Sequence, residues 1–318
     1  MPLIQHSNYR APVWLRGGHA QTIHPVLFRK VEKITAHPHR LELDDGDFLD
    51  VEWTGKDRER LAIISHGLEG SLGAIYVQGM ATALWRRGWD VLVWSFRGCS
   101  GELNRNSSFY HSGATRDLDA VIQHAFKCHP ANKIDLVGFS LGGNLTLKYI
   151  GERGGDIDPR IVASACFSVP CELASSSAEL ARWENKIYME RFLKSLRSKV
   201  REKAMVYPDV LDTRGIDGLK SFAEFDERFT APLHGFSNAE DYWMRSSCRQ
   251  FLPGVTIPTL LVSAANDPIL GKDCYPYPEA ENSDSFYLEV PRQGGHVGFG
   301  PGSEYWSETR AAEFLALR

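Results

Sequence analysis

The chain has 318 residues, of which 43% are hydrophobic and 24% charged, with a net charge of −4. This is an ordinary globular composition, and no basic stripe suggests nucleic acid as a partner. No apolar stretch approaches the roughly 18 residues of a membrane span, and the first residues do not resemble a signal peptide. We therefore expect no integral membrane span and a cytoplasmic location. Six cysteines without a C-x-x-C pair fit reduced thiols in that compartment.

Residues 1–40 are rich in aromatic and histidine side chains but have no clear periodicity. We expect them to form an ordered N-terminal arm packed on the core. The pair His37 and His39 offers two metal ligands, but no further ligand follows at a suitable spacing. No phosphate-binding loop or dinucleotide fingerprint occurs either. We therefore expect neither a metal nor a cofactor.

From residue 61 onward, short apolar runs alternate with helix-like stretches. This alternation predicts βαβ units and a mainly parallel sheet flanked by helices, which is the α/β class. The helix-like stretches include 115–127 and 142–150. The apolar runs are 61–64, 91–94, 134–137 and 161–163, and they return at 259–262 and 286–290.

Residues 171–253 interrupt this alternation with a charged, helix-rich segment. We interpret the segment as a helical cap inserted over the carboxyl edge of the sheet, where ligands of open α/β sheets bind. The core is then formed by residues 41–170 and 254–318. A helical decoration far from any site is the alternative. Apolar residues recur at helical spacing within the segment: Met189, Phe192, Leu193, Leu196 and Val200. We expect the face that carries the first four to pack partly on the core and partly to line an acyl pocket.

The segment Gly138–Gly142 reads G-x-S-x-G and is the one match to this pattern in the chain. An apolar run leads into it and a helical stretch leaves it, as in the strand–turn–helix of a nucleophile elbow. The sharp turn strains the serine backbone and requires small neighbours. Ser140 is therefore the predicted nucleophile.

A serine hydroxyl needs a base, and in this kind of fold the chain order is serine, acid, histidine. Of the 11 histidines, only His234 and His296 lie well after Ser140. His296 follows the last strand, whereas His234 falls within the expected cap, so His296 is the predicted base. Asp267 follows the preceding strand and is the predicted acid that orients the imidazole. The competing carboxylates are Asp241 and Asp273.

The oxyanion of a tetrahedral intermediate needs hydrogen-bond donors. The first predicted donor is the backbone N–H of Leu141, the residue after the nucleophile. The second is the backbone N–H of Leu68, in the glycine-rich loop 65–70 that follows an early strand. We interpret His66 in the same loop as a buried residue that braces it, not as a base.

Several motifs, in order, resemble those of the YheT-like α/β hydrolases, which are related to the medium-chain fatty-acid ethyl ester synthase/esterases. They are residues 17–22, 65–71, 96–101, 110–113, 138–144 and 294–299. The resemblance implies an α/β-hydrolase fold with Ser140, Asp267 and His296 as catalytic residues. It also implies hydrolysis of carboxylic esters with short or medium acyl chains, with a small-molecule ester as substrate. The alternatives are acyl transfer to alcohols through the same acyl-enzyme, and a non-catalytic ligand-binding protein on this fold.

Overall fold

The computed structural model describes residues 2–32 and 34–317. Within these residues the strands form one nine-stranded sheet of order β1-β9-β8-β7-β6-β4-β5-β3-β2. Its pairs are parallel except β2 with β3 and β3 with β5, which confirms the predicted α/β class. The strands are β1 (Leu3–Ile4), β2 (His37–Glu42), β3 (Phe48–Trp53), β4 (Arg60–Ser65), β5 (Asp90–Trp94), β6 (Lys133–Phe139), β7 (Ile161–Phe167), β8 (Thr259–Val262) and β9 (Phe286–Glu289).

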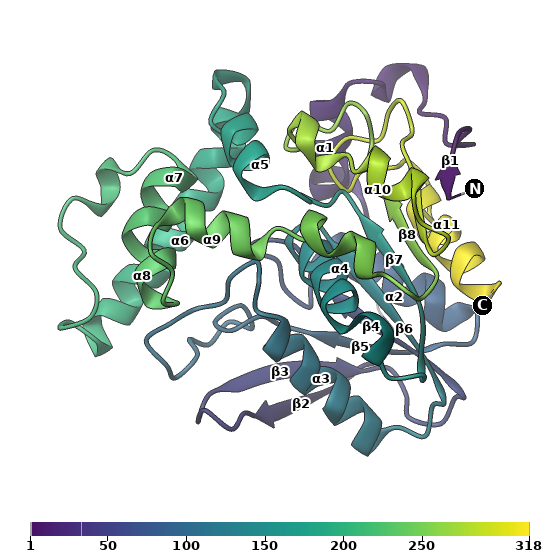
Figure 1. Cartoon of the computed structure of the whole chain (residues 1–318), viewed down its shortest axis with the longest axis horizontal. Helices are drawn as coiled ribbons and strands as arrows, with labels where there is room; N and C mark the ends of the chain where they lie inside the picture. Colours follow the sequence, from purple (N-terminus) through teal and green to yellow (C-terminus); the bar gives the residue numbers. More distant parts are fainter. Residues whose placement is uncertain (1, 33, 318) are drawn as a thin grey trace.

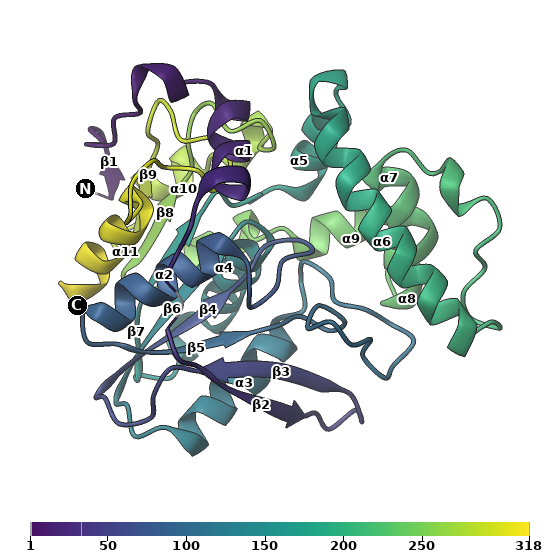
Figure 2. The same ribbon diagram turned by 180° about the vertical axis from the view of Figure 1, so that it is seen from behind.

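Helices cover both faces of the sheet (Figures 1 and 2). On one face, α2 (Ile75–Arg86) and α11 (Trp306–Ala316) contribute to one apolar core. On the other, α3 (Thr115–Cys128), α4 (Leu141–Arg153) and α10 (Tyr277–Glu281) contribute to a second core. Burial on both faces explains why the central strands are continuous apolar runs. Helix α3 buries one apolar face, formed by Leu118, Val121, Ile122 and Ala125.

The N-terminal segment is built into the sheet at one edge and lies over its carboxyl end. Strand β1 pairs in parallel with β9, and the boundary expected at residue 40 falls inside β2. Between them lie the 3-10 helix η1 (Val13–Leu15) and helix α1 (Gly18–Phe28). Helix α1 lies close to the loops that follow β8 and β9 (Figure 1).

Between β7 and β8 the chain forms a separate group of helices at one end of the sheet (Figures 1 and 2). We call residues 171–253 the helical insertion. It has its own apolar cluster, which includes Leu193 and Val200, while Phe192 and Leu196 are only half-buried. Its helices are α5 (Leu173–Leu180), η3 (Trp183–Asn185), α6 (Lys186–Val206), η4 (Ile216–Gly218), α7 (Phe222–Phe225), the π-helix η5 (Asp226–Thr230), α8 (Ala231–Leu233) and α9 (Ala239–Ser246), and η6 (Arg249–Gly254) follows.

Two further 3-10 helices lie outside the helical insertion: η2 (Gly154–Asp156) and η7 (Lys272–Cys274). Across the described ranges 2–32 and 34–317, no helix is both long and apolar enough to cross a membrane.

Candidate active site

Ser140 lies in the turn between β6 and α4, with φ 51° and ψ −120°. This backbone conformation is unfavourable for a residue with a side chain and is typical of functional turns. The turn is possible because its neighbours are glycines. A Cβ at position 142 would lie 2.3 Å from the carbonyl oxygen of His66, and one at 138 would lie 2.6 Å from Cα of Gly143. The predicted strand–turn–helix therefore has a steric basis in the structure.

The structure brings Ser140, His296 and Asp267 together. His296 Nε2 lies 2.9 Å from Ser140 Oγ, and His296 Nδ1 lies 2.8 Å from Asp267 Oδ2. A carboxylate only accepts, so Nδ1 carries the proton and Nε2 is free to accept the serine hydroxyl. The Asp267 side chain is fully buried, and its Oδ1 also accepts the backbone N–H of Ile269 at 2.9 Å. The carboxylate is thus fixed in place relative to the imidazole.

The competing residues have other partners. The His234 ring packs against that of His111, with centroids 4.4 Å apart, and burial lowers the pKa of His234 to about 4. Asp241 accepts the backbone N–H of Ser237 within the insertion. Asp273 is exposed in η7.

The loop after β4 passes directly beside Ser140. A Cβ at Gly67 would lie 3.2 Å from Cβ of Ser140. Leu68 and Leu141 both line the cavity that contains Ser140, and no acceptor for either backbone N–H lies among the described residues. Two unpaired amides beside the serine are suited to stabilise a developing oxyanion.

His66 holds this loop in place through both nitrogens of its ring. The residue is fully buried, its Nε2 accepts the N–H of Phe96, and its Nδ1 therefore donates to the carbonyl oxygen of Gly67 at 2.7 Å. Burial lowers the pKa of His66 to about 4, so the ring is neutral at physiological pH. Both ring nitrogens are occupied, which leaves His66 no role as a base toward Ser140.

Residues that the sequence did not identify hold the histidine loop. The His296 amide donates to Thr22 Oγ1 at 2.9 Å, and the Gly295 amide donates to Asn266 Oδ1 at 3.1 Å. The Val297 amide donates to Ser168 Oγ at 2.9 Å. Thr22 belongs to the motif at 17–22 that carried the family resemblance, but its spacing gave no indication of this contact.

A cavity runs from Ser140 and His296 into the helical insertion. It offers about 1020 Å³ of space, including its open mouth. The insertion supplies most of its wall through aromatic and aliphatic side chains. These side chains include Phe192, Leu196, Phe225 and Phe229.

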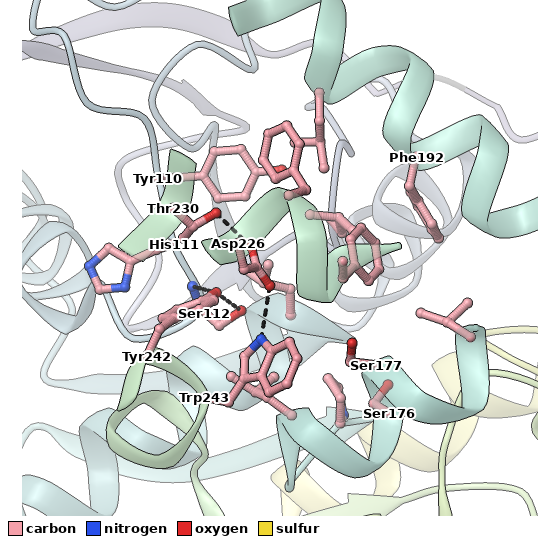
Figure 3. A pocket seen from close by; sticks show the side chains of 18 of the residues that line it. Tyr110, His111, Ser112, Ser176, Ser177, Phe192, Asp226, Thr230, Tyr242 and Trp243 are labelled. Atoms are coloured by element: carbon pink, nitrogen blue, oxygen red, sulfur yellow. Dashed lines mark hydrogen bonds between the residues drawn. The ribbon is translucent and has the colours of Figure 1, made fainter. Parts of the chain in front are cut away.

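One carboxylate lies in this largely apolar wall (Figure 3). Asp226 accepts hydrogen bonds from Thr230 Oγ1 at 2.6 Å and from Trp243 Nε1 at 2.8 Å. Burial raises the pKa of Asp226 to about 6, although both hydrogen bonds act in the opposite direction. The insertion thus adds a titratable group to the cavity.

No group of three or more His, Cys, Asp or Glu side chains in the described part of the chain is placed to hold a metal ion. His39, one of the two candidate ligands, stacks on His124 with ring centroids 5.0 Å apart.

Residues 56–274 match the family described as serine aminopeptidase, S33 (Hydrolase_4). The chain is 34% identical over 308 residues to YheT of Escherichia coli (strain K12), a provisionally named esterase, covering 93% of this chain and 89% of that one. It is 26% identical to the phospholipase ABHD3 of Mus musculus, covering 94% of this chain and 74% of the relative. The solved Pyrococcus furiosus esterase PF2001 superposes with a TM-score of 0.62 at 16% identity, covering 98% of this chain and 99% of that one.

The fold and these matches define the class as the α/β hydrolases. The chain belongs to the Hydrolase_4 family, and within it to the YheT-like proteins, which confirms the resemblance read from its motifs. It is an enzyme of the carboxylic ester hydrolase class.

Proposed function

We propose that the chain hydrolyses carboxylic esters with short- or medium-chain acyl groups through an acyl-enzyme on Ser140. The observation that carries this proposal is the hydrogen-bonded chain from Ser140 Oγ through His296 to Asp267, at 2.9 and 2.8 Å, beside an apolar cavity. The names of its relatives, an esterase and a phospholipase, support ester substrates.

In the proposed mechanism His296 Nε2 accepts the proton of Ser140 as Oγ attacks the ester carbonyl carbon. The amides of Leu68 and Leu141 then donate to the oxyanion. His296 returns the proton to the alkoxide, which leaves as an alcohol and yields the acyl-enzyme. Water, deprotonated by the same imidazole, releases the carboxylic acid and restores the serine. Asp267 stabilises the imidazolium in both steps.

The proposal is tested with a fluorophosphonate probe and with p-nitrophenyl esters from acetate to laurate. The wild type should be labelled and should turn over the shorter members. Ser140→Ala should lose the label and lose on the order of 10⁶ in kcat while remaining folded. Aminoacyl p-nitroanilides serve as the comparison, because the family description names an aminopeptidase. An unlabelled wild type, or Ser140→Ala with a tenth of the wild-type turnover, would overturn the proposal.

A further inference from the structure

The loop that supplies the Leu68 amide is held in an unfavourable conformation. Glu69, the next residue, has a φ of 53°, in the left-handed region that non-glycine residues rarely adopt. Such a residue keeps its conformation only where the surroundings hold it. The contacts of Glu69 therefore help to hold the loop that carries the adjacent Leu68 amide.

Glu69 is held by the helical insertion as well as by the core. Its carboxylate Oε1 accepts Lys199 Nζ at 2.7 Å and the Tyr110 hydroxyl at 2.7 Å, and Oε2 accepts the Ser195 hydroxyl. Its backbone N–H donates to the same Tyr110 oxygen at 3.0 Å. Lys199 Nζ also donates to Cys99 Sγ at 3.0 Å. Both carboxylate oxygens of Glu69 thus have hydrogen-bond partners.

Two of these partners come from one face of α6. Ser195 and Lys199 are four residues apart, so both side chains reach toward Glu69 from the same side of the helix. The Lys199 and Glu69 side chains are only 15% and 8% exposed. A buried ion pair gains little stability over an apolar pair because both ions lose their hydration. The Lys199–Glu69 pair is therefore better explained by the position that it gives to Glu69 than by a gain in stability.

Lys199 of this pair also lines the cavity of the proposed site. Leu68 and Lys199 line the same cavity as Ser140 and His296. The insertion thus contacts the core at the residue that follows Leu68, whose backbone N–H has no acceptor among the described residues and which lines the same cavity as the serine. An oxyanion donor is effective only when it is fixed before the charge develops.

We propose that Lys199, together with Ser195, holds Glu69 so that the Leu68 amide is fixed at the oxyanion position, making turnover depend on the seating of the helical insertion. Lys199 and Glu69 are positioning residues and do not contact the reacting atoms. This inference rests on the proposed function.

The test compares Lys199→Met with Arg201→Met in the full chain. Arg201 lies on the same helix and pairs with the exposed Asp217, so its substitution removes an ion pair of α6 that does not touch the loop. Lys199→Met should lower kcat by roughly tenfold to a hundredfold, less than the ~10²–10³ of losing a donor outright, with KM little changed. Arg201→Met should behave as wild type.

A second measurement separates positioning from attachment of the insertion. Affinity for a trifluoromethyl ketone, which forms a tetrahedral oxyanion on the serine, should fall by the same factor as kcat/KM in Lys199→Met. The double variant Glu69→Gln with Lys199→Met leaves no unpaired buried charge, so its melting temperature should recover toward that of the wild type. Its kcat should stay low, because the neutral pair no longer fixes the loop.

The inference is overturned if Lys199→Met lowers the melting temperature but keeps kcat within about twofold of wild type when assayed well below that temperature. It is also overturned if the double variant regains full kcat. In both cases the wild type is still labelled by the fluorophosphonate and active. Failure of the proposed function is distinct, because the wild type itself would then lack label and turnover.

Discussion

The backbone N–H of His296 donates a 2.9 Å hydrogen bond to Oγ1 of Thr22, which lies 274 positions earlier in the chain. Thr22 Oγ1 in turn donates to the carbonyl oxygen of Gly18 at 2.7 Å, within α1. The first helix therefore fixes the loop that presents the imidazole to Ser140. The N-terminal segment is in this way connected to the geometry of the site.

Thr22→Val keeps the shape of the side chain and removes the acceptor. We expect kcat to fall about tenfold, because a small displacement of a catalytic group has a large effect on the rate. Thr22→Ser keeps the hydroxyl and should stay near wild type. Steady-state kinetics with a p-nitrophenyl ester, alongside melting temperatures, measures this. Wild-type kcat in Thr22→Val would show that the loop holds its position without this bond.

Asp267→Asn should keep the packing but favour the wrong tautomer of His296, since the amide nitrogen can donate to Nδ1. We expect kcat to fall by roughly 10⁴ with a small change in melting temperature. Asp273→Asn is the matched control, because Asp273 follows the same strand but is exposed. A loss in the Asp273 variant and not in the Asp267 variant would reverse the assignment of the acid.

Phe192→Ala should change the acyl-chain preference, because Phe192 lies on the cavity-facing side of α6. Each buried methylene contributes about 0.8 kcal/mol, so kcat/KM should rise about fourfold per methylene until the cavity is filled. The variant should flatten this dependence or move its maximum.

Leu193→Ala on the same helix is the control for that experiment. Leu193 is fully buried in the cluster of the insertion, so its truncation should cost about 2–5 kcal/mol of stability and leave the profile unchanged. If Phe192→Ala only lowers stability, then Phe192 packs the insertion and does not select substrates.

Asp226 should make stability depend on pH. Its pKa is about 6 in the folded chain against an ordinary 3.8, so the folded state binds the proton more tightly. Folding therefore carries no penalty from this group below pH ~4, and the penalty grows to at most about 3 kcal/mol as the pH rises through 6.

Asp226→Asn removes that titration. Relative to wild type, the free energy of unfolding of the variant should increase by up to about 3 kcal/mol between pH 4 and pH 8. Urea denaturation at a series of pH values measures the difference. The constant effect of losing a hydrogen bond to Trp243 or Thr230 cancels in this comparison. If the difference in unfolding free energy between variant and wild type does not vary with pH, then the pKa of Asp226 is not raised by folding.

The features that the sequence predicted well are those set by local chemistry. Continuous apolar runs indicated the buried parallel strands β4, β5 and β6, because such strands are covered on both faces. The spacing Gly138, Ser140, Gly142 indicated the sharp turn, because residues with side chains at the glycine positions would collide with the neighbouring backbone. Chain order then indicated His296 and Asp267 among the histidines and carboxylates, and in the structure His296 contacts Ser140 while Asp267 contacts His296.

The boundary expected at residue 40, between the N-terminal arm and the core, falls inside strand β2. Strand β2 begins at His37 and is exposed along much of its length, so its sequence has no apolar run to mark it. It is defined by pairing with β3. A strand whose side chains face solvent is recognised by its hydrogen-bonded neighbour, which the sequence does not reveal.

The amino-acid sequence by itself predicted the buried parallel strands and the elbow at Ser140, because each depends on side chains close together in the chain. The order of serine, acid and histidine along the chain then indicated Asp267 and His296. Only the tertiary structure decided which distant groups hold them. Thr22 meets His296, and Lys199 meets Glu69 across 130 positions. These contacts arise from the packing of α1 and α6 against loops far away in sequence, and residue spacing carries no information about that packing.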